Sequence, residues 1–186
     1  MAAVAGAAAV TLALAGCASA PDTLSTSPAD LLAEHDLAGM SAEEIVDRLD
    51  RTSLDDRPAE LIASVRPNVL LITDGEQELS LSMPADRTYV SIAPYIEQTH
   101  DCFFHSLTTC RGELSGESVE VRIIDDVSGE VLVDETTSTF DNGFVGYWLP
   151  RGAEGSIQVS YAGRTGVVPF STGGEAATCI TSLRLV

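Results

Sequence analysis

The chain has 186 residues, a formal net charge of −18 at pH 7 and no lysine, so all ten of its basic residues are arginines. This strong negative charge repels phosphate backbones and excludes nucleic acid as an expected partner. The absence of lysine excludes enzymes that depend on a P-loop lysine, a Schiff-base lysine or a Ser-x-x-Lys pair.

The first 17 residues are predicted to be a bacterial lipoprotein signal. Met1 to Ala20 contains no charged residue, and Leu14-Ala15-Gly16-Cys17 resembles a lipobox. Cys17, the last residue of this motif, is the expected lipidation site. Its acyl chains would hold the protein at the membrane, because membrane affinity grows by about 0.8 kcal/mol per buried methylene of an acyl chain. The segment lacks the basic residues that begin a signal peptide, and the alternative is an uncleaved anchor of barely the roughly 20 residues that span a bilayer. The expected location is the cell envelope, extracytoplasmic and lipid-anchored.

Residues 18–28 are predicted to be a flexible tether, and residues 29–66 a small helical region. Ser27-Pro28-Ala29-Asp30 offers an N-cap and a first-turn proline for one helix. Ser41-Ala42-Glu43-Glu44 is the capping box of a second helix, which should run to about Asp50. Pro58 to Val65 predicts a third short helix. Helices this short need a partner, so we expect them to pack on the rest of the chain or on a second copy.

At residue 68 the period of the apolar residues changes from 3.6, which is typical of helices, to 2, which is typical of strands. Residues 68–186 are therefore predicted to form a β-rich domain. Phe144 and Trp148 are expected to be core residues. Strands are expected at residues 68–73, 79–83, 88–93, 118–124, 130–137, 143–149, 156–161, 166–171 and 178–185. The predicted fold class is therefore α+β, with short N-terminal helices followed by a mainly antiparallel β sandwich or barrel-like domain.

The connection from Pro94 to Glu117 is too long for a hairpin. It has about 24 residues, where hairpin loops take two to five, and loops of this length are usually functional or disordered. It contains His100-Asp101-Cys102-Phe103-Phe104-His105-Ser106-Leu107-Thr108-Thr109-Cys110, which holds two of the four cysteines and two of the three histidines. Its aromatic and threonine content argues against disorder, so we expect a functional loop.

Thiolate and imidazole bind soft or borderline transition metals, and three interpretations of the cysteines are open. In an exported protein, Cys102 and Cys110 would form a structural disulfide, which leaves Cys179 as an odd thiol. Zinc would take three cysteines and one histidine, but the spacing of Cys102 and Cys110 exceeds the usual knuckle. Cu(I) would accept the same donors, and Arg111 beside Cys110 would offset their negative charge. The candidate metal ligands are Cys102, Cys110, Cys179, His100 and His105.

The chain resembles the CueP family of periplasmic copper-binding proteins. The resemblance rests on Ser91-Ile92-Ala93-Pro94-Tyr95, residues 99–114, Ala63-Ser64-Val65-Arg66-Pro67, Asp141-Asn142-Gly143-Phe144, Trp148-Leu149-Pro150 and Ala177-Thr178-Cys179. It implies a copper-resistance protein that sequesters copper outside the cytoplasm and passes it on, in that family to a periplasmic superoxide dismutase. It also implies an N-terminal segment that dimerises. The family cysteines map onto Cys102, Cys110 and Cys179, and the motif histidines onto His100 and His105.

The expected function is therefore binding of Cu(I) for sequestration or delivery, with no catalytic residue. One alternative is a redox protein, in which two thiols reduce Cu(II) to Cu(I) and are left as a disulfide. Another is a disulfide-stabilised envelope lipoprotein that holds no metal. The expected partners are the copper ion, the membrane through the lipid anchor, a cuproenzyme such as superoxide dismutase and a second copy of the chain.

Overall fold

The computed structural model describes Met1 and residues 28–186. The predicted signal, its Cys17 and most of the predicted tether lie outside the described residues. No helix among the described residues is long and apolar enough to cross a membrane. The helices are α1 (Pro28–Glu34), α2 (Ala42–Asp50) and the short 3-10 helix η1 (Leu54–Asp56). The strands are β1 (Ile62–Val65), β2 (Val69–Thr73), β3 (Glu78–Ser82), β4 (Arg87–Ile92), β5 (Ser118–Asp125), β6 (Val131–Ser138), β7 (Val145–Pro150), β8 (Glu154–Tyr161), β9 (Arg164–Ser171) and β10 (Cys179–Ile180).

Helix α2 begins and ends where its sequence predicts. The Ser41 side chain accepts the backbone N–H of Glu44, and the Glu44 carboxylate accepts the N–H of Ser41 at 2.8 Å, so the capping box is complete. One face of the helix is buried against β1, β2 and β3 in a common core. The buried residues of α2 are Ala42, Ile45, Val46, Leu49 and Asp50.

The third predicted helix is wrong, because residues 62–65 form β1. Leu61, Ala63 and Val65 are at most 1% exposed, whereas Ile62, which lies between Leu61 and Ala63, is 48% exposed. This period of 2 suits a strand with one buried face. β1 pairs with β2 in an antiparallel ladder, with Ala63 opposite Ile72. This pairing stabilises the segment more than a helix of the same length would, because so short a helix makes few hydrogen bonds.

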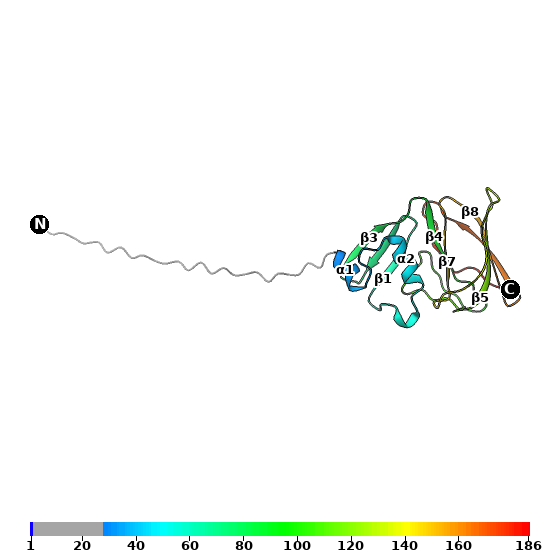
Figure 1. Ribbon diagram of the computed structural model, residues 1–186, viewed down its shortest axis with the longest axis horizontal. Helices are drawn as coiled ribbons and strands as arrows, with labels where there is room; N and C mark the ends of the chain where they lie inside the picture. Colours follow the sequence, from blue (N-terminus) through cyan, green and yellow to red (C-terminus); the bar gives the residue numbers. More distant parts are fainter. Residues whose placement is uncertain (2–27) are drawn as a thin grey trace.

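The strands form three sheets that lie side by side along the molecule. Figure 1 shows α1, α2, β1 and β3 at one end, β4 and β7 in the middle, and β5 and β8 at the other end. The sheet orders are β1-β2-β3, β10-β4-β7 and β6-β5-β8-β9, and none of them closes into a barrel within the described residues. The prediction of a mainly antiparallel sandwich is confirmed, and a closed barrel is excluded for this part of the chain.

Strand β4 is central because both of its faces are buried. Tyr89 packs into the core shared with the helices, whereas Val90 and Ile92 pack into the core under the four-stranded sheet. The alternation of side chains along β4 therefore joins two cores. Ser91, which shares a face with Tyr89, is directed toward the end of α2 and binds Asp50.

The last predicted strand, residues 178–185, is wrong in length and pairing. Only Cys179 and Ile180 form a strand, and β10 lies parallel to β4 with Cys179 opposite Ser91. The N–H groups of Ser91 and Ala93 donate to Thr178 O and Ile180 O, two residues apart, whereas the next acceptor, Leu183 O, is three residues further on, so an extra residue interrupts the regular ladder after Ile180. The chain still follows β4 irregularly, since the N–H of Tyr95 donates to Leu183 O at 3.0 Å.

Candidate metal centre

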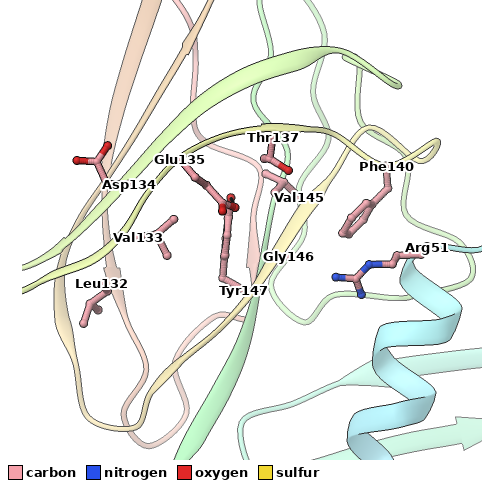
Figure 2. A pocket seen from close by; sticks show the side chains of 10 residues that line it. All are labelled: Arg51, Leu132, Val133, Asp134, Glu135, Thr137, Phe140, Val145, Gly146 and Tyr147. Atoms are coloured by element: carbon pink, nitrogen blue, oxygen red, sulfur yellow. Dashed lines mark hydrogen bonds between the residues drawn. The ribbon is translucent and has the colours of Figure 1, made fainter.

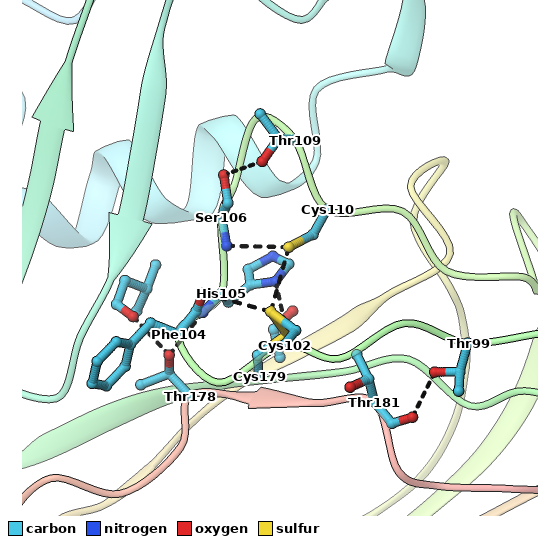
Figure 3. The surroundings of a disulfide bond; sticks show 12 residues. Thr99, Cys102, Phe104, His105, Ser106, Thr109, Cys110, Thr178, Cys179 and Thr181 are labelled. Atoms are coloured by element: carbon cyan, nitrogen blue, oxygen red, sulfur yellow. Dashed lines mark hydrogen bonds between the residues drawn. A yellow bond between two sulfur atoms is a disulfide. The ribbon is translucent and has the colours of Figure 1, made fainter. Parts of the chain in front are cut away.

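The long loop between β4 and β5 is ordered by backbone hydrogen bonds to two strands. The N–H of Val65 at the end of β1 donates to His105 O at 2.8 Å, and Leu107 N donates to Ala63 O at 2.9 Å. On the other side, Cys179 N donates to Phe103 O at 3.1 Å. The loop thus lies between β1 and β10 and contains four of the five predicted ligands, of which Figure 3 labels Cys102, His105 and Cys110.

The three cysteines outside the signal meet at one point. Cys102 and Cys179 form a disulfide with their Cα atoms 5.7 Å apart, and Cys110 is free. The Sγ atoms of Cys102 and Cys110 lie 3.5 Å apart without a bond. The interpretation of Cys102 and Cys110 as a disulfide pair is therefore wrong, since Cys102 pairs with Cys179. The reason is tertiary: the parallel placement of β10 beside β4 brings Cys179 under the loop, within bridging distance of Cys102.

Each of the two loop histidines lies close to two of these sulfurs. His105 is completely buried, and its Nδ1 lies 3.8 Å from Cys179 Sγ. His100 is exposed, and its ring forms one group with Cys102 and Cys110 in which the possible ligand atoms lie within 4.8 Å of one another. His105 forms a second such group with Cys110 and Cys179. All five predicted ligands are thus brought together, and their role as ligands remains a prediction.

The Asp50 carboxylate binds the buried His105 imidazole at Nε2, the ring nitrogen that faces away from the thiols. Its Oδ1 lies 2.9 Å from His105 Nε2, and both side chains are completely buried. The other partners of the carboxylate are Tyr89 Oη at 2.6 Å, Ser91 Oγ at 3.3 Å and Asn142 Nδ2 at 2.8 Å. With Nε2 held by the carboxylate, Nδ1 is the nitrogen that faces the thiols. This carboxylate–imidazole pair is the arrangement that orients metal-ligating histidines.

Sequence reasoning missed Asp50, although two signals were present. The residue lies eight positions after Ala42, on the apolar stripe of α2, where an unpaired carboxylate would be costly to bury. It also lies at the C-terminal end of the helix, where the macrodipole disfavours negative charge. A carboxylate in such a position requires a buried donor. The sequence does not tell which residue provides it.

A glycine makes room for this network. A Cβ at Gly146 on β7 would overlap the hydroxyl group of Tyr89 on the neighbouring strand. The two strands are paired at this point, with Val90 opposite Tyr147 and Ser91 opposite Gly146. Only glycine lets the tyrosine hydroxyl extend past β7 to reach Asp50.

The electrostatics of the pair favour its ionised form. Burial raises the pKa of Asp50, but the charge of His105 and the hydrogen bonds from His105, Tyr89 and Asn142 outweigh burial and lower the pKa overall. Burial likewise lowers the pKa of His105, while the attraction of Asp50 outweighs it and raises the pKa to about 9. The metal-free site therefore holds a carboxylate and an imidazolium at neutral pH, and a metal ion must displace the proton on Nδ1.

Cys110 is a reactive thiol. Burial raises its pKa, but the hydrogen bond and charge of His105, followed by a hydrogen bond from His100, lower the pKa to about 7. Alkylation of Cys110 in the oxidised protein should therefore be slow below pH 7 and rise through this pH, about two pH units earlier than for an ordinary thiol. Its rate with iodoacetamide between pH 5 and pH 10 measures this, with the Cys110→Ser variant as blank. A midpoint above pH 8.5 would contradict the interaction with the histidines.

Two further residues complete the surroundings. Phe144 is buried as predicted, and its ring lies 4.5 Å from the His105 ring centroid and 6.3 Å from that of His100, so it also forms a wall of the site. Arg57 donates from Nη1 to Cys110 O at 2.8 Å, and its Nε and Nη2 are buried with no partner among the described residues. Arg111, which we expected to offset the thiolate charge, is exposed.

The other grooves of the described part of the chain carry no comparable set of donors. A groove of about 450 Å³ between β6 and β7 is lined by Arg51, Glu135, Phe140, Tyr147 and other residues shown in Figure 2. Its Tyr147 hydroxyl donates to the Glu135 carboxylate at 3.0 Å. It has neither cysteine nor histidine. The thiol centre opens instead into a more apolar groove of about 560 Å³, beside Phe103 and Ile180.

Comparison with known proteins agrees with this geometry. The family model of the periplasmic copper-binding protein CueP matches residues 44–184, which include Asp50, the loop and Cys179. The crystal structure of S.CueP is similar with a TM-score of 0.81 and 40% sequence identity, over 88% of this chain and 99% of that chain. No curated protein sequence gives a match. The chain therefore belongs to the CueP family of periplasmic copper-binding proteins.

Proposed function

We propose that the reduced protein binds Cu(I) through Cys102, Cys110 and Cys179 together with His105 or His100, and holds it for copper resistance. The observation that carries this proposal is the meeting of three sulfurs with a buried imidazole whose Nδ1 faces them, 3.8 Å from Cys179 Sγ. Thiolate and imidazole are soft and borderline donors that suit Cu(I). His105 is completely buried against Phe144, so the inner side of the site is shielded from solvent.

The test is metal binding by the protein after reduction of its disulfide. Cuprous ion supplied anaerobically as a chelator complex should bind in a ratio of one per chain. X-ray absorption should then find more sulfur than nitrogen among the neighbours of the copper. Binding of Zn(II) in preference to Cu(I), or copper with only nitrogen and oxygen neighbours, would refute the proposal.

Arg57 supports the choice of a monovalent ion. Three thiolates leave a net charge of −2 around Cu(I) but only −1 around Zn(II), so a nearby cation favours the cuprous complex by one unit charge. Arg57→Met should therefore lower the ratio of Cu(I) to Zn(II) affinity by about tenfold. Competition titrations with both metals measure this ratio. Arg122→Met is the matched control, because Arg122 is exposed on β5 beside Asp134; an equal fall in both variants would contradict a local role of Arg57.

A second function is favoured by the disulfide itself. Cys102 and Cys179 form the bond that two thiols would be left with after giving one electron each to two Cu(II) ions. An external thiol reductant would then have to restore them. Cu(II) added anaerobically to the reduced protein separates the two functions: two cuprous ions formed per two thiols lost supports reduction, and repeated turnover with added thiol would make reduction the main activity.

The site of action and the partners are also proposals. The lipobox supports attachment to the envelope membrane through acylated Cys17, which the mass of the mature protein from membranes would test. The family resemblance supports dimerisation through the helical region of residues 29–66 and delivery of copper to a superoxide dismutase, with residues 68–186 as the copper-binding domain. Sedimentation of the mature chain tests the dimer, and metal transfer to an apo-dismutase tests delivery.

A further inference from the structure

The five candidate ligands form two overlapping groups of three. One consists of His100, Cys102 and Cys110, and the other of His105, Cys110 and Cys179. In each group the possible ligand atoms lie within 4.8 Å of one another, and Cys110 belongs to both. Because Cu(I) accepts low coordination numbers with thiolate and imidazole, each group is a complete cuprous site once the disulfide is reduced.

The two groups differ in access to solvent. His105 and Cys179 are 0% and 3% exposed, whereas His100 is exposed and Cys102 is partly buried. His100 lies at a polar groove of about 430 Å³ that also includes Gln98 and Arg111. A ligand from another molecule therefore reaches an ion in the first group more easily than one in the second, where His105 is completely buried and Cys179 meets solvent only at the apolar groove beside Phe103.

The two histidines also differ in how they are held. The Nε2 of His105 is fixed by the buried Asp50 at 2.9 Å, and its ring packs on Phe144 at 4.5 Å. The His100 ring touches the same phenylalanine only at 6.3 Å between centroids. A ligand oriented by a buried carboxylate binds more tightly than one without such a partner, so the inner group is the stronger of the two.

We infer that the protein has two cuprous positions that share Cys110: an outer exchange position at His100 and Cys102, and an inner storage position at His105 and Cys179. This inference rests on the proposed binding of Cu(I), and it divides the three proposed sulfurs between two positions, so that the ion has two of them as ligands in each. The ion enters at the outer position and moves inward while it keeps its bond to Cys110. Its bonds to His100 and Cys102 break as those to His105 Nδ1 and Cys179 form. The freed Cys102 thiolate takes up a proton as the Cys179 thiol loses one, and the proton of Nδ1 is released to solvent. The oxidation state of copper does not change.

The test compares His100→Gln with His105→Gln in the reduced protein, using Cu(I) supplied as its bicinchoninate complex. His100→Gln should leave the equilibrium affinity within about threefold but slow the transfer of copper from and to the chelator by about tenfold. His105→Gln should lower the affinity by at least about tenfold. His35→Gln, on the loop after α1, is the control for loss of a histidine elsewhere.

A second background makes the test sharper. Cys179→Ser removes one ligand of the inner position and leaves the outer group intact, so its remaining copper should depend on His100. His100→Gln should then cost at least about tenfold in affinity in the Cys179→Ser chain, in contrast to its small cost in the unaltered chain. Both substitutions are conservative in size, and circular dichroism of the metal-free variants checks that they fold.

Two results would overturn the inference. Equal losses of affinity for His100→Gln and His105→Gln in the unaltered chain would mean a single site with both histidines as ligands. An unchanged transfer rate for His100→Gln would mean that copper does not pass through the outer position. Failure of the unaltered reduced protein to bind Cu(I) is a separate result, which refutes the proposed function and with it both positions.

Discussion

Replacing Cys110 with serine is expected to lower the Cu(I) affinity of the reduced protein by more than about a hundredfold. Cys110 is the one sulfur that belongs to both groups of candidate ligands. Serine keeps the size of the side chain but offers a hard, neutral oxygen, which Cu(I) does not favour. The measurement is a competition titration with a cuprous chelator under anaerobic conditions, after complete reduction of the thiols.

The other cysteines provide the comparison. Cys102→Ser and Cys179→Ser each leave one group of three intact and should cost less than Cys110→Ser. Met83→Leu removes a buried sulfur from the core beneath α2 and should leave the affinity unchanged. An unchanged affinity for Cys179→Ser would show that Cys102 and Cys110 suffice, and the model with three thiolates would then be wrong.

Replacing Asp50 with asparagine is expected to reduce the free energy of unfolding of the metal-free protein by about 3 to 5 kcal/mol. All the groups around the carboxylate are donors: His105 Nε2 and Asn142 Nδ2 point to Oδ1, and the Tyr89 and Ser91 hydroxyl groups to Oδ2. The amide of asparagine has one N–H₂ group, which would face two of these donors without a hydrogen bond. The neutral amide would also leave the buried imidazolium of His105 without its countercharge. Urea unfolding followed by fluorescence of Trp148 measures the change.

Asp47→Asn is the matched control for this substitution. Asp47 lies on the same helix but its side chain is 43% exposed, and it pairs with Arg51 at 3.3 Å and accepts a hydrogen bond from Trp148 Nε1 at 3.1 Å. Its substitution should change stability by less than about 1 kcal/mol, as is usual for exposed ion pairs. Similar losses for Asp47→Asn and Asp50→Asn would contradict the role given to the buried pair.

The same substitution should also weaken copper binding. Removal of a carboxylate behind a metal-bound histidine typically lowers metal affinity by about 10- to 100-fold. If Asp50→Asn binds Cu(I) as tightly as the unaltered chain while His105→Gln does not, then the imidazole is oriented by its packing on Phe144 rather than by Asp50. The two variants together thus separate orientation of the ligand from its presence.

Elements with local signals were predicted well. The capping box placed the start of α2, because its hydrogen bonds join residues three positions apart. The alternation of apolar side chains placed β2 and β4 to β9 within a few residues. Residues 58–65 failed because Leu61, Ile62 and Val65 also fit a helical spacing, and only pairing with β2 buries Ala63 and exposes Ile62. The apolar residues of this segment fit both a helix and a strand, and the pairing of β1 with β2 decided for the strand.

The ligand chemistry and the loop that presents it could be inferred from the amino-acid sequence alone. Cysteine and histidine side chains in an over-long connection of a β domain limited the site to soft metals or thiol chemistry, whatever the fold. Which sulfurs meet was decided only by the tertiary structure. Cys102 and Cys179 are separated by 77 residues, and their contact depends on the parallel placement of β10 beside β4. Asp50 likewise contacts His105 only because α2 packs close to the long loop, which brings together two residues that are 55 positions apart in the chain. Local patterns extend over a few residues, whereas a metal centre is assembled by the packing of elements that are distant in the chain.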